Sequence, residues 1–224
     1  MDPEPNVSQT PHGRAGGFAD ALSALSRLLA DPRLDELSRA RWWVPPLLYG
    51  PCILALLALS VRSLDAATIL MGAALGYGVW TLTEYLGHRF VFHADLPGEL
   101  GARLHVLIHG AHHEHPEDPL RLVMPALLSA PLLLAALAAT WLLIGFPAGF
   151  PPMTGFLIGS LGYDMTHYWV HQGAPRTRIG RSLRRNHMRH HFQDPNRGFG
   201  VSGPWWDHVF GTAHPSARRR AAAK

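Results

Sequence analysis

Long uncharged stretches of apolar residues recur along this 224-residue chain and predict a bundle of membrane-spanning helices. The first stretch, Trp42–Val61, contains 20 residues, enough to cross about 30 Å of hydrocarbon at about 1.5 Å per residue. Three more follow: Ala66–Thr83 (continuing to His88), Leu122–Phe146, and a run from Phe156 that becomes polar at Asp164 and reaches His171. The second run contains Gly72, Gly76 and Gly78, which would allow a neighbouring helix to approach closely. The pattern predicts an all-α membrane protein with four transmembrane helices.

The two ends of the chain are expected to lie outside this bundle. Residues 1–17 are rich in Pro, Gly and small polar residues without periodicity, which predicts disorder. Residues 18–29 repeat apolar positions at helical spacing, so an amphipathic helix is expected, lying either on the membrane surface or against the protein itself. We therefore divide the chain into an N-terminal region (1–40), a membrane domain (41–212) and a basic disordered tail (213–224).

The distribution of basic residues predicts the orientation of the bundle. Five arginines precede the first span, ten arginines and Lys224 follow His171, and the turn Phe146–Pro152 carries none. Basic residues favour the cytoplasmic side, so both termini are expected in the cytoplasm. This explains the C-terminal charge without a nucleic-acid partner. The location would be the cell (inner) membrane in a bacterium, which the arginine- and alanine-rich composition suggests, or the endoplasmic reticulum in a eukaryote.

Histidines carry the candidate chemistry, and ten of the 15 fall in four clusters. The clusters are His88 with His93, His109 with His112 and His113, His167 with His171, and His187 with His190 and His191. The spacing HxxHH occurs twice, and residues three and four apart share one face of a helix. Neutral imidazole is a common metal ligand, and ten imidazoles exceed the needs of one ion, so two metals are expected. Cys52 is the only cysteine in the sequence, so an internal disulfide is excluded and thiolates are not expected among the metal ligands.

The predicted spans bring all four clusters to one membrane face. The second span ends at His88, the next cluster lies in the following loop, and the fourth span returns His167 and His171 to the same side. His88 and His93 are five residues apart, which is about 140° around a straight α-helix, so the helix is expected to end between them.

Other polar residues near the clusters have weaker signals. His105 shares a helical face with His109 but sits a turn earlier, so we expect it to support a ligand or to pack. Glu84 and Asp164 precede His88 and His167 by one turn, where each carboxylate could accept the second ring N–H of a ligand; an ordinary polar contact is the alternative. The isolated His12, His115, His208 and His214 are expected to be solvated.

Several motifs resemble those of the fatty acid hydroxylase superfamily. The histidine boxes are His88-Arg-Phe-Val-Phe-His93, His109-Gly-Ala-His-His113, Tyr163-Asp-Met-Thr-His-Tyr168 and His187-Met-Arg-His-His191. Their flanks, Arg121-Leu-Val-Met-Pro125, Gly198-Phe-Gly200 and Trp206-Asp-His-Val-Phe-Gly-Thr212, resemble the fatty acid 2-hydroxylase branch. The resemblance runs from about Trp42 to Thr212.

This resemblance implies four membrane helices under a cytosolic helical cap that holds two non-haem metal ions on the ten clustered histidines. Members of the branch use O₂ to hydroxylate the carbon next to the carboxyl group of a fatty acyl chain, often one carried by a sphingoid base. The metal would be iron, although zinc suits the same ligands. Many eukaryotic members carry an N-terminal cytochrome b5 domain, and the residues before Trp42 are too few for one. Electrons are therefore expected from a separate protein of cytochrome b5 or ferredoxin type.

Two other functions remain open from the sequence. A sterol or carotenoid oxidase of the same superfamily would use similar histidine boxes, and the box at His109 followed by Arg121-Leu-Val-Met-Pro125 disfavours it by resemblance alone. A metal transporter would also join histidines to four spans, but it should place its ligands near the middle of the bilayer rather than at one end.

Overall fold

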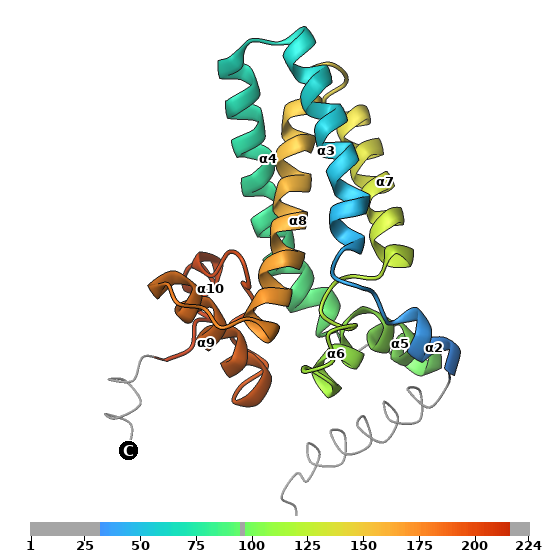
Figure 1. Cartoon of the computed structure of the whole chain (residues 1–224), viewed down its shortest axis with the longest axis vertical. Helices are drawn as coiled ribbons and strands as arrows, with labels where there is room; N and C mark the ends of the chain where they lie inside the picture. The colour runs from blue at the N-terminus through green and yellow to red at the C-terminus, as the bar shows by residue number, and fades with distance from the viewer. Residues whose placement is uncertain (1–31, 95–96, 216–224) are drawn as a thin grey trace, which may run out of the picture.

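The computed structural model describes residues 32–94 and 97–215, and all regular structure in these ranges is helical. Four long helices form an upright bundle: α3 (Val44–Ser63), α4 (Ala66–Gly87), α7 (Ala126–Leu143) and α8 (Phe150–Gln172) (Figure 1). Shorter elements lie below it: α2 (Pro32–Leu37), η1 (His88–Phe92), α5 (Gly98–His105), η2 (Val106–Gly110), α6 (Ala111–Glu114), α9 (Arg178–Phe192) and α10 (Trp205–Val209). The all-α architecture is as predicted. The disorder and amphipathic helix expected within residues 1–31, and most of the predicted tail, lie outside the described residues.

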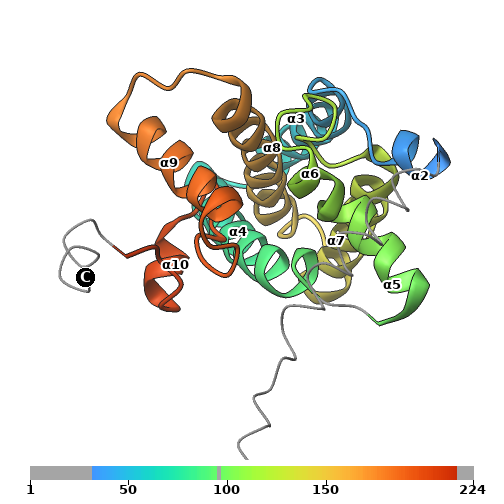
Figure 2. The same ribbon diagram turned by 90° about the horizontal axis from the view of Figure 1, so that it is seen from below.

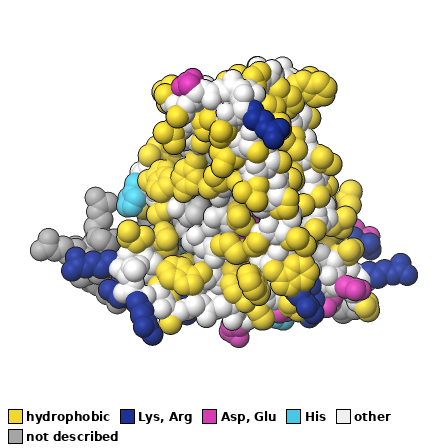
Figure 3. All heavy atoms as spheres, turned by 45° about the horizontal axis from the view of Figure 1, so that its top comes forward, with side chains coloured by type: hydrophobic (Ala, Val, Ile, Leu, Met, Phe, Trp, Pro, Cys, Tyr) yellow, Lys and Arg dark blue, Asp and Glu magenta, His cyan; other side chains and the backbone are white. Residues whose placement is uncertain are grey.

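Three of the long helices are long and apolar enough to cross a membrane. They are α3, α4 with its continuation η1 (together Ala66–Phe92), and α7. Large apolar side chains point outward from them; Leu142 and Leu143 at the end of α7, for example, are 81% and 84% exposed. Figure 3 shows this surface, where hydrophobic side chains cover much of the bundle and most charged side chains lie around its lower rim. Such a surface suits lipid better than water.

The fourth long helix, α8, is the centre of the bundle and contacts α3, α4 and α7. Of its 23 residues, 11 are buried and only three are exposed, and it carries Asp164, His167 and His171. It is not among the three helices that qualify as spans by composition. Its polarity follows from its position, because a helix enclosed by other helices does not need an apolar outer face.

Glycines allow α4 and α8 to pack backbone against backbone. A Cβ atom at Gly76 would lie 1.8 Å from the carbonyl oxygen of Pro152, and one at Gly155 would lie 1.9 Å from that of Ala73. Gly72 similarly contacts Pro151, whereas Gly78 faces open space. The prediction of close approach therefore holds for Gly72 and Gly76 and is wrong for Gly78.

The third apolar run divides into two parts. The helix α7 begins only at Ala126, after Pro125, because the residue before a proline disfavours helical geometry. Leu122 and Val123 are buried in the non-helical link that leads to α7. The prediction that the span starts at Leu122 is therefore wrong by four residues, and the link lies close to the histidines instead.

The elements below the bundle form two groups that close around its lower end (Figure 2). One consists of α2, α5, η2 and α6, and the other of α9 and α10. Arg121 links α2 to the segment that follows α6. Its buried guanidinium donates to Ser38 Oγ at 2.5 Å, to Asp118 at 3.1 Å and to Asp35. A buried cation is tolerated because its charge and its N–H groups are matched in this way.

Candidate metal centre

The ten clustered histidines meet at the lower end of the bundle and form two groups of five. Group A contains His88, His93, His109, His113 and His190, and group B contains His112, His167, His171, His187 and His191. Within each group, one ring nitrogen per residue lies within 4.8 Å of the corresponding nitrogen of every other member. Either group could hold a metal ion.

Each HxxHH motif contributes to both groups. His109 and His113, four residues apart, belong to group A, while His112 between them belongs to group B. In α9 the division is reversed, because His187 and His191 belong to group B and His190 to group A. On one helical face, the residue at i+4 lies about 40° to one side of residue i and the residue at i+3 lies about 60° to the other side. The repeated spacing therefore joins two neighbouring sites.

Distances between ring nitrogens fit ligation of a shared ion. In group A, the Nε2 atoms of His88 and His109 are 3.1 Å apart, and those of His93 and His190 are 3.0 Å apart. In group B, the Nε2 atom of His112 lies 2.9 Å from that of His191 and 3.0 Å from that of His167. Two nitrogens bound at right angles about 2.1 Å from one ion would lie about 3.0 Å apart, so the rings converge as metal ligands do.

A π-helical turn places His88 and His93 in the same group. The α-helix α4 gives way to the π turn η1, which ends at Phe92, so the helix ends between the two histidines as predicted; the amide of His93 donates to the carbonyl of His88 at 3.3 Å. This i to i+5 bond widens the turn and brings residues five apart towards one side of the helix. A straight α-helix would place these two side chains about 140° apart, and the π turn interrupts that geometry.

A second π turn, η2, lies between α5 and α6 and separates His105 from the ligand cluster. His105 is in neither group, and its ring lies against Gly110, where a Cβ atom would be 2.8 Å from the ring carbon Cδ2. The packing role proposed for His105 agrees with this position.

Backbone carbonyls orient imidazoles of both groups. The Nδ1 atom of His88 lies 2.6 Å from the carbonyl oxygen of Phe199, that of His190 lies 2.9 Å from Arg197, and that of His167 lies 2.8 Å from Leu122. An Nδ1–H that donates to a carbonyl leaves the lone pair on Nε2, which faces the other histidines. Sequence reasoning missed these partners because backbone carbonyls have no side-chain signal.

The two carboxylates expected to accept imidazole N–H groups bind backbone instead. Glu84 accepts from the amides of Val201 and Ser202, both at 2.7 Å, and Asp164 accepts from the amide of Met124 at 3.0 Å. Direct contact with a ligand was therefore the wrong prediction for both. Each instead holds a backbone segment whose neighbouring carbonyl binds His88 or His167.

Burial keeps the imidazoles uncharged. It lowers the pKa of His93 to about 3 and that of His190 to about 4, with a nearby His190 adding to the effect on His93. Burial likewise holds the pKa values of His109, His113 and His187 well below the ordinary value. Because a protonated ring has no free lone pair, these shifts make the histidines available to a metal at neutral pH.

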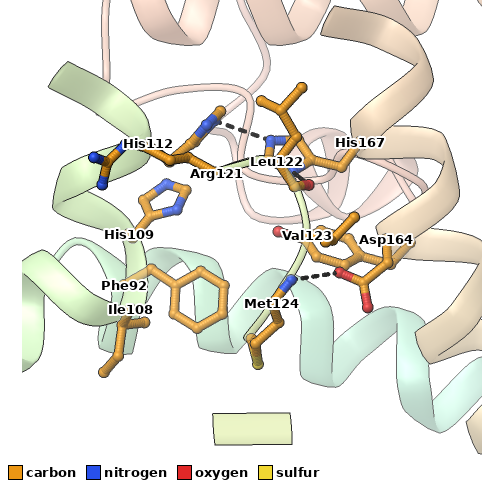
Figure 4. A pocket seen from close by; sticks show the side chains of 11 residues that line it. Phe92, Ile108, His109, His112, Arg121, Leu122, Val123, Met124, Asp164 and His167 are labelled. Atoms are coloured by element: carbon orange, nitrogen blue, oxygen red, sulfur yellow. Dashed lines mark hydrogen bonds between the residues drawn. The ribbon is translucent and has the colours of Figure 1, made fainter. Parts of the chain in front are cut away.

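Two neighbouring cavities lie between the bundle surface and the histidines. The larger, about 270 Å³, lies between the long helices and is lined mostly by apolar side chains, with the exposed Val91 and Leu132 among them. The smaller, about 30 Å³, has room for about one water-sized molecule. Figure 4 shows His109, His112 and His167 pointing into this smaller space. The residues that line both cavities are Phe92, Met124, Tyr163 and Asp164.

The isolated histidines divide into exposed and packed. His115 and His208 are exposed, as predicted, whereas His12 lies outside the described residues. His214 is half-buried, and its Nε2 would be 2.7 Å from a Cβ atom at Gly198, so the prediction that it is solvated is wrong. Its sequence neighbours carry no apolar periodicity that would have shown this packing.

The chain is similar to known proteins in sequence and in structure. The sequence model of the fatty acid hydroxylase family matches residues 73–212. The dihydroceramide fatty acyl 2-hydroxylase FAH2 of Arabidopsis thaliana is 38% identical over 180 residues, covering 80% of this chain and 76% of that protein. The human fatty acid 2-hydroxylase is 30% identical over 211 residues, covering 84% of this chain and 57% of that protein. A solved structure of full-length scs7p, with only the hydroxylase domain visible, aligns with a TM-score of 0.77 at 32% identity, covering 81% of this chain and 70% of that one.

Proposed function

The chain belongs to the fatty acid hydroxylase family, and we propose that it is an oxidoreductase that hydroxylates a fatty acyl chain at C2, using O₂ and two metal ions. The observation that carries the proposal is that histidines of both groups line a small cavity that shares four lining residues with the larger apolar cavity. Relatives named fatty acid 2-hydroxylase and dihydroceramide fatty acyl 2-hydroxylase support the substrate class and the position.

We propose that the ten histidines of groups A and B hold two non-haem iron ions, one in each group. When bound, such a pair would activate O₂ and so oxidise an alkyl C–H bond, which no side chain can do alone. The all-imidazole donor set also suits zinc, so a purified sample can contain zinc without contradicting an iron requirement. His105 stays outside the ligand set because it packs on Gly110.

The apolar cavity would position the substrate. An acyl tail lying along Trp80, Leu133 and Phe156 would bury apolar surface, and its carboxyl end would reach Tyr163 and Asp164 beside the smaller cavity. Only the first carbons of the chain would then lie near the histidines. Regioselectivity would come from holding the carboxyl end, and chain length would change affinity more than position.

A separate one-electron carrier of cytochrome b5 or ferredoxin type would supply the reductant. Hydroxylation inserts one oxygen atom of O₂ and reduces the other to water, which consumes two electrons and two protons per product. Support for a docking place comes from α9, which carries three histidines of the two groups and the exposed Arg178, Arg181 and Arg185. An acidic carrier bound there would be one helix away from the metals.

We propose that α8 crosses the membrane with the other three long helices, with both chain termini and the shorter helices forming a cap on the cytoplasmic side. Its 23 residues are long enough to span, and its neighbours cover its polar face. A polar side chain that faces lipid is costly, and Thr154, Ser160, Asp164 and His167 of α8 are buried within the protein. The same topology makes the protein multi-pass and places the acyl cavity at bilayer depth.

The two rival functions have less support. A metal transporter should carry ligands midway along its spans, whereas the histidines here lie at one end of the bundle. A sterol or carotenoid oxidase differs from the proposed enzyme in its product.

Expression in a host that lacks 2-hydroxy lipids separates these alternatives. The chain should produce 2-hydroxy acyl lipids, and the His112→Ala variant should not. Accumulation of oxidised sterol or carotenoid, with no 2-hydroxy acyl product, would overturn the proposal.

A further inference from the structure

The loop of residues 197–203, between α9 and α10, orients two ligands of the same group. The carbonyl oxygens of Arg197 and Phe199 accept from His190 and His88, and both histidines belong to group A. In group B the backbone partners belong to the link between α6 and α7, Leu122 for His167 and Pro116 for His171. The Nδ1 atoms of three of its members are buried without a hydrogen-bond partner among the described residues; these members are His112, His187 and His191.

Two buried carboxylates hold this loop in place. Glu84 Oε1 accepts from the amides of Val201 and Ser202, and Glu84 Oε2 accepts from the Ser202 hydroxyl. Asp207, at the other side of the loop, accepts from the amides of Phe199 and Gly200 at 2.9 and 2.8 Å. Hydrogen bonds to a buried carboxylate are short and strong, so they restrict the loop more than neutral bonds would.

The cost of burying Glu84 indicates that it has a role. Its side chain is 5% exposed and lies in α4, within a helix that is apolar enough to cross a membrane. A carboxyl group in such a place is destabilising unless all its oxygens are satisfied. Its partners in the described structure belong to residues 201–203 of the loop, and none is an imidazole.

We propose that Glu84 is a positioning residue for one of the two metals: it clamps residues 199–203 so that the carbonyls of Phe199 and Arg197 orient His88 and His190 of group A. Glu84 in α4 and His88 at the start of η1 lie one turn apart along a continuous helix. One helical turn therefore presents a ligand and also fixes the loop that orients that ligand. The inference rests on the dinuclear centre proposed above and adds an asymmetry between its two sites.

The clamp predicts a selective loss of metal. Removing a group that orients a metal-binding histidine typically weakens affinity about 10–100-fold. In Glu84→Leu, which keeps the volume but accepts no hydrogen bond, group A should therefore lose its ion to a competing chelator while group B keeps its own. Metal per chain, measured by elemental analysis after dialysis against the chelator, should fall from two to about one.

Two matched variants separate the clamp from charge and from general destabilisation. In Glu84→Gln the remaining Oε1 can still accept both amides, and the new NH₂ can donate to the Ser202 hydroxyl, so both metals should stay. Leu56→Ala opens a hole in the core of α3 away from the loop and should lower the melting temperature without a selective loss of metal. If Glu84→Gln loses the ion as well, charge rather than the clamp is responsible and the proposal is wrong.

Combined variants show which group is emptied. Glu84→Leu in a His191→Ala background, where group B is damaged, should leave almost no metal. The same change in a His113→Ala background, where group A is already damaged, should leave the metal content unchanged. The reverse pattern would contradict the proposal.

The loop's second anchor keeps the test decisive if Glu84→Leu does not fold. Asp207→Asn puts an N–H donor against one of the two amides, so it should release the loop from the other side and empty group A. A folded Glu84→Leu or Asp207→Asn protein that keeps both ions overturns the inference. Wild-type protein that holds fewer than two ions would instead overturn the dinuclear centre itself.

Discussion

At the scale of single residues, the ten clustered histidines differ from the exposed His115 and His208 in burial and in their contacts with one another. His112 and His190 are buried and each has an Nε2 atom close to that of another histidine, whereas His208 is exposed. We expect His112→Ala and His190→Ala to bind less metal and to lose product formation by at least about 100-fold, more than loss of a supporting group would cost. His208→Ala should match wild type in metal content and product. Full activity in either buried-site variant would remove that histidine from the ligand set.

The same burial makes the metal-free protein sensitive to acid. Burial lowers the pKa of His93 to about 3 and that of His190 to about 4, so below about 6.5 the unfolded chain binds protons that the folded chain does not. Stability should therefore fall as the pH drops below about 6.5. The melting temperature of metal-stripped protein should be lower at pH 5.5 than at pH 7.5, with a smaller difference in His93→Gln. An equal or higher melting temperature at pH 5.5 would contradict the assigned direction of these shifts.

Sequence reasoning identified the ten histidines but not how they divide. The HxxHH spacing showed that His109 and His113 share a face, and the topology brought all four clusters to one end. The π turn from His88 to Phe92 was not predicted, because such a turn depends on tertiary packing and has no marker in the sequence. The carbonyls of Phe199 and Leu122 were invisible for a similar reason, since any residue carries a carbonyl.

At the scale of elements, the contact between α4 and α8 positions the histidines of both helices. Gly76 and Gly155 let the backbones touch, so histidines about three to four turns further along meet at the site. The apolar runs predicted α3 and α4 to within two residues, because composition alone limits a span. They misplaced the start of α7, because Leu122 and Val123 are buried by protein and apolarity does not distinguish protein from lipid.

A pair of glycine variants tests this helix contact. In Gly76→Ala the new Cβ would overlap the Pro152 carbonyl, so the helices must separate, and we expect a loss of about 1–3 kcal/mol or more. In Gly78→Ala nothing lies within 4 Å, so stability should be unchanged or slightly higher. The melting temperatures of the two detergent-solubilised variants, with unfolding monitored by size-exclusion chromatography, are compared directly. Equal melting temperatures would show that α4 and α8 are not packed as described.

At the scale of the whole molecule, the arrangement of the helices predicts which loops face which side of the membrane. Ala148, in the turn between α7 and α8, and Ala174, between α8 and α9, are both exposed and lie at opposite ends of α8. In a Cys52→Ala background, Ala148→Cys should react with an impermeant thiol reagent added outside intact cells, and Ala174→Cys should react only after lysis. Labelling of Ala174→Cys from outside would invert the proposed orientation, and equal labelling of both would remove α8 as a span.

The position of oxidation on the acyl chain tests the proposed reaction most directly. The purified, iron-loaded protein would be supplied with fatty acyl lipids, a reducing system and isotopically labelled O₂, and the products mapped by mass spectrometry. With the tail in the apolar cavity and the carboxyl end beside the histidines, the product should be a 2-hydroxy acyl chain with one labelled oxygen. Oxidation near the methyl end, a new double bond, or a hydroxyl oxygen taken from water would contradict C2 hydroxylation by O₂.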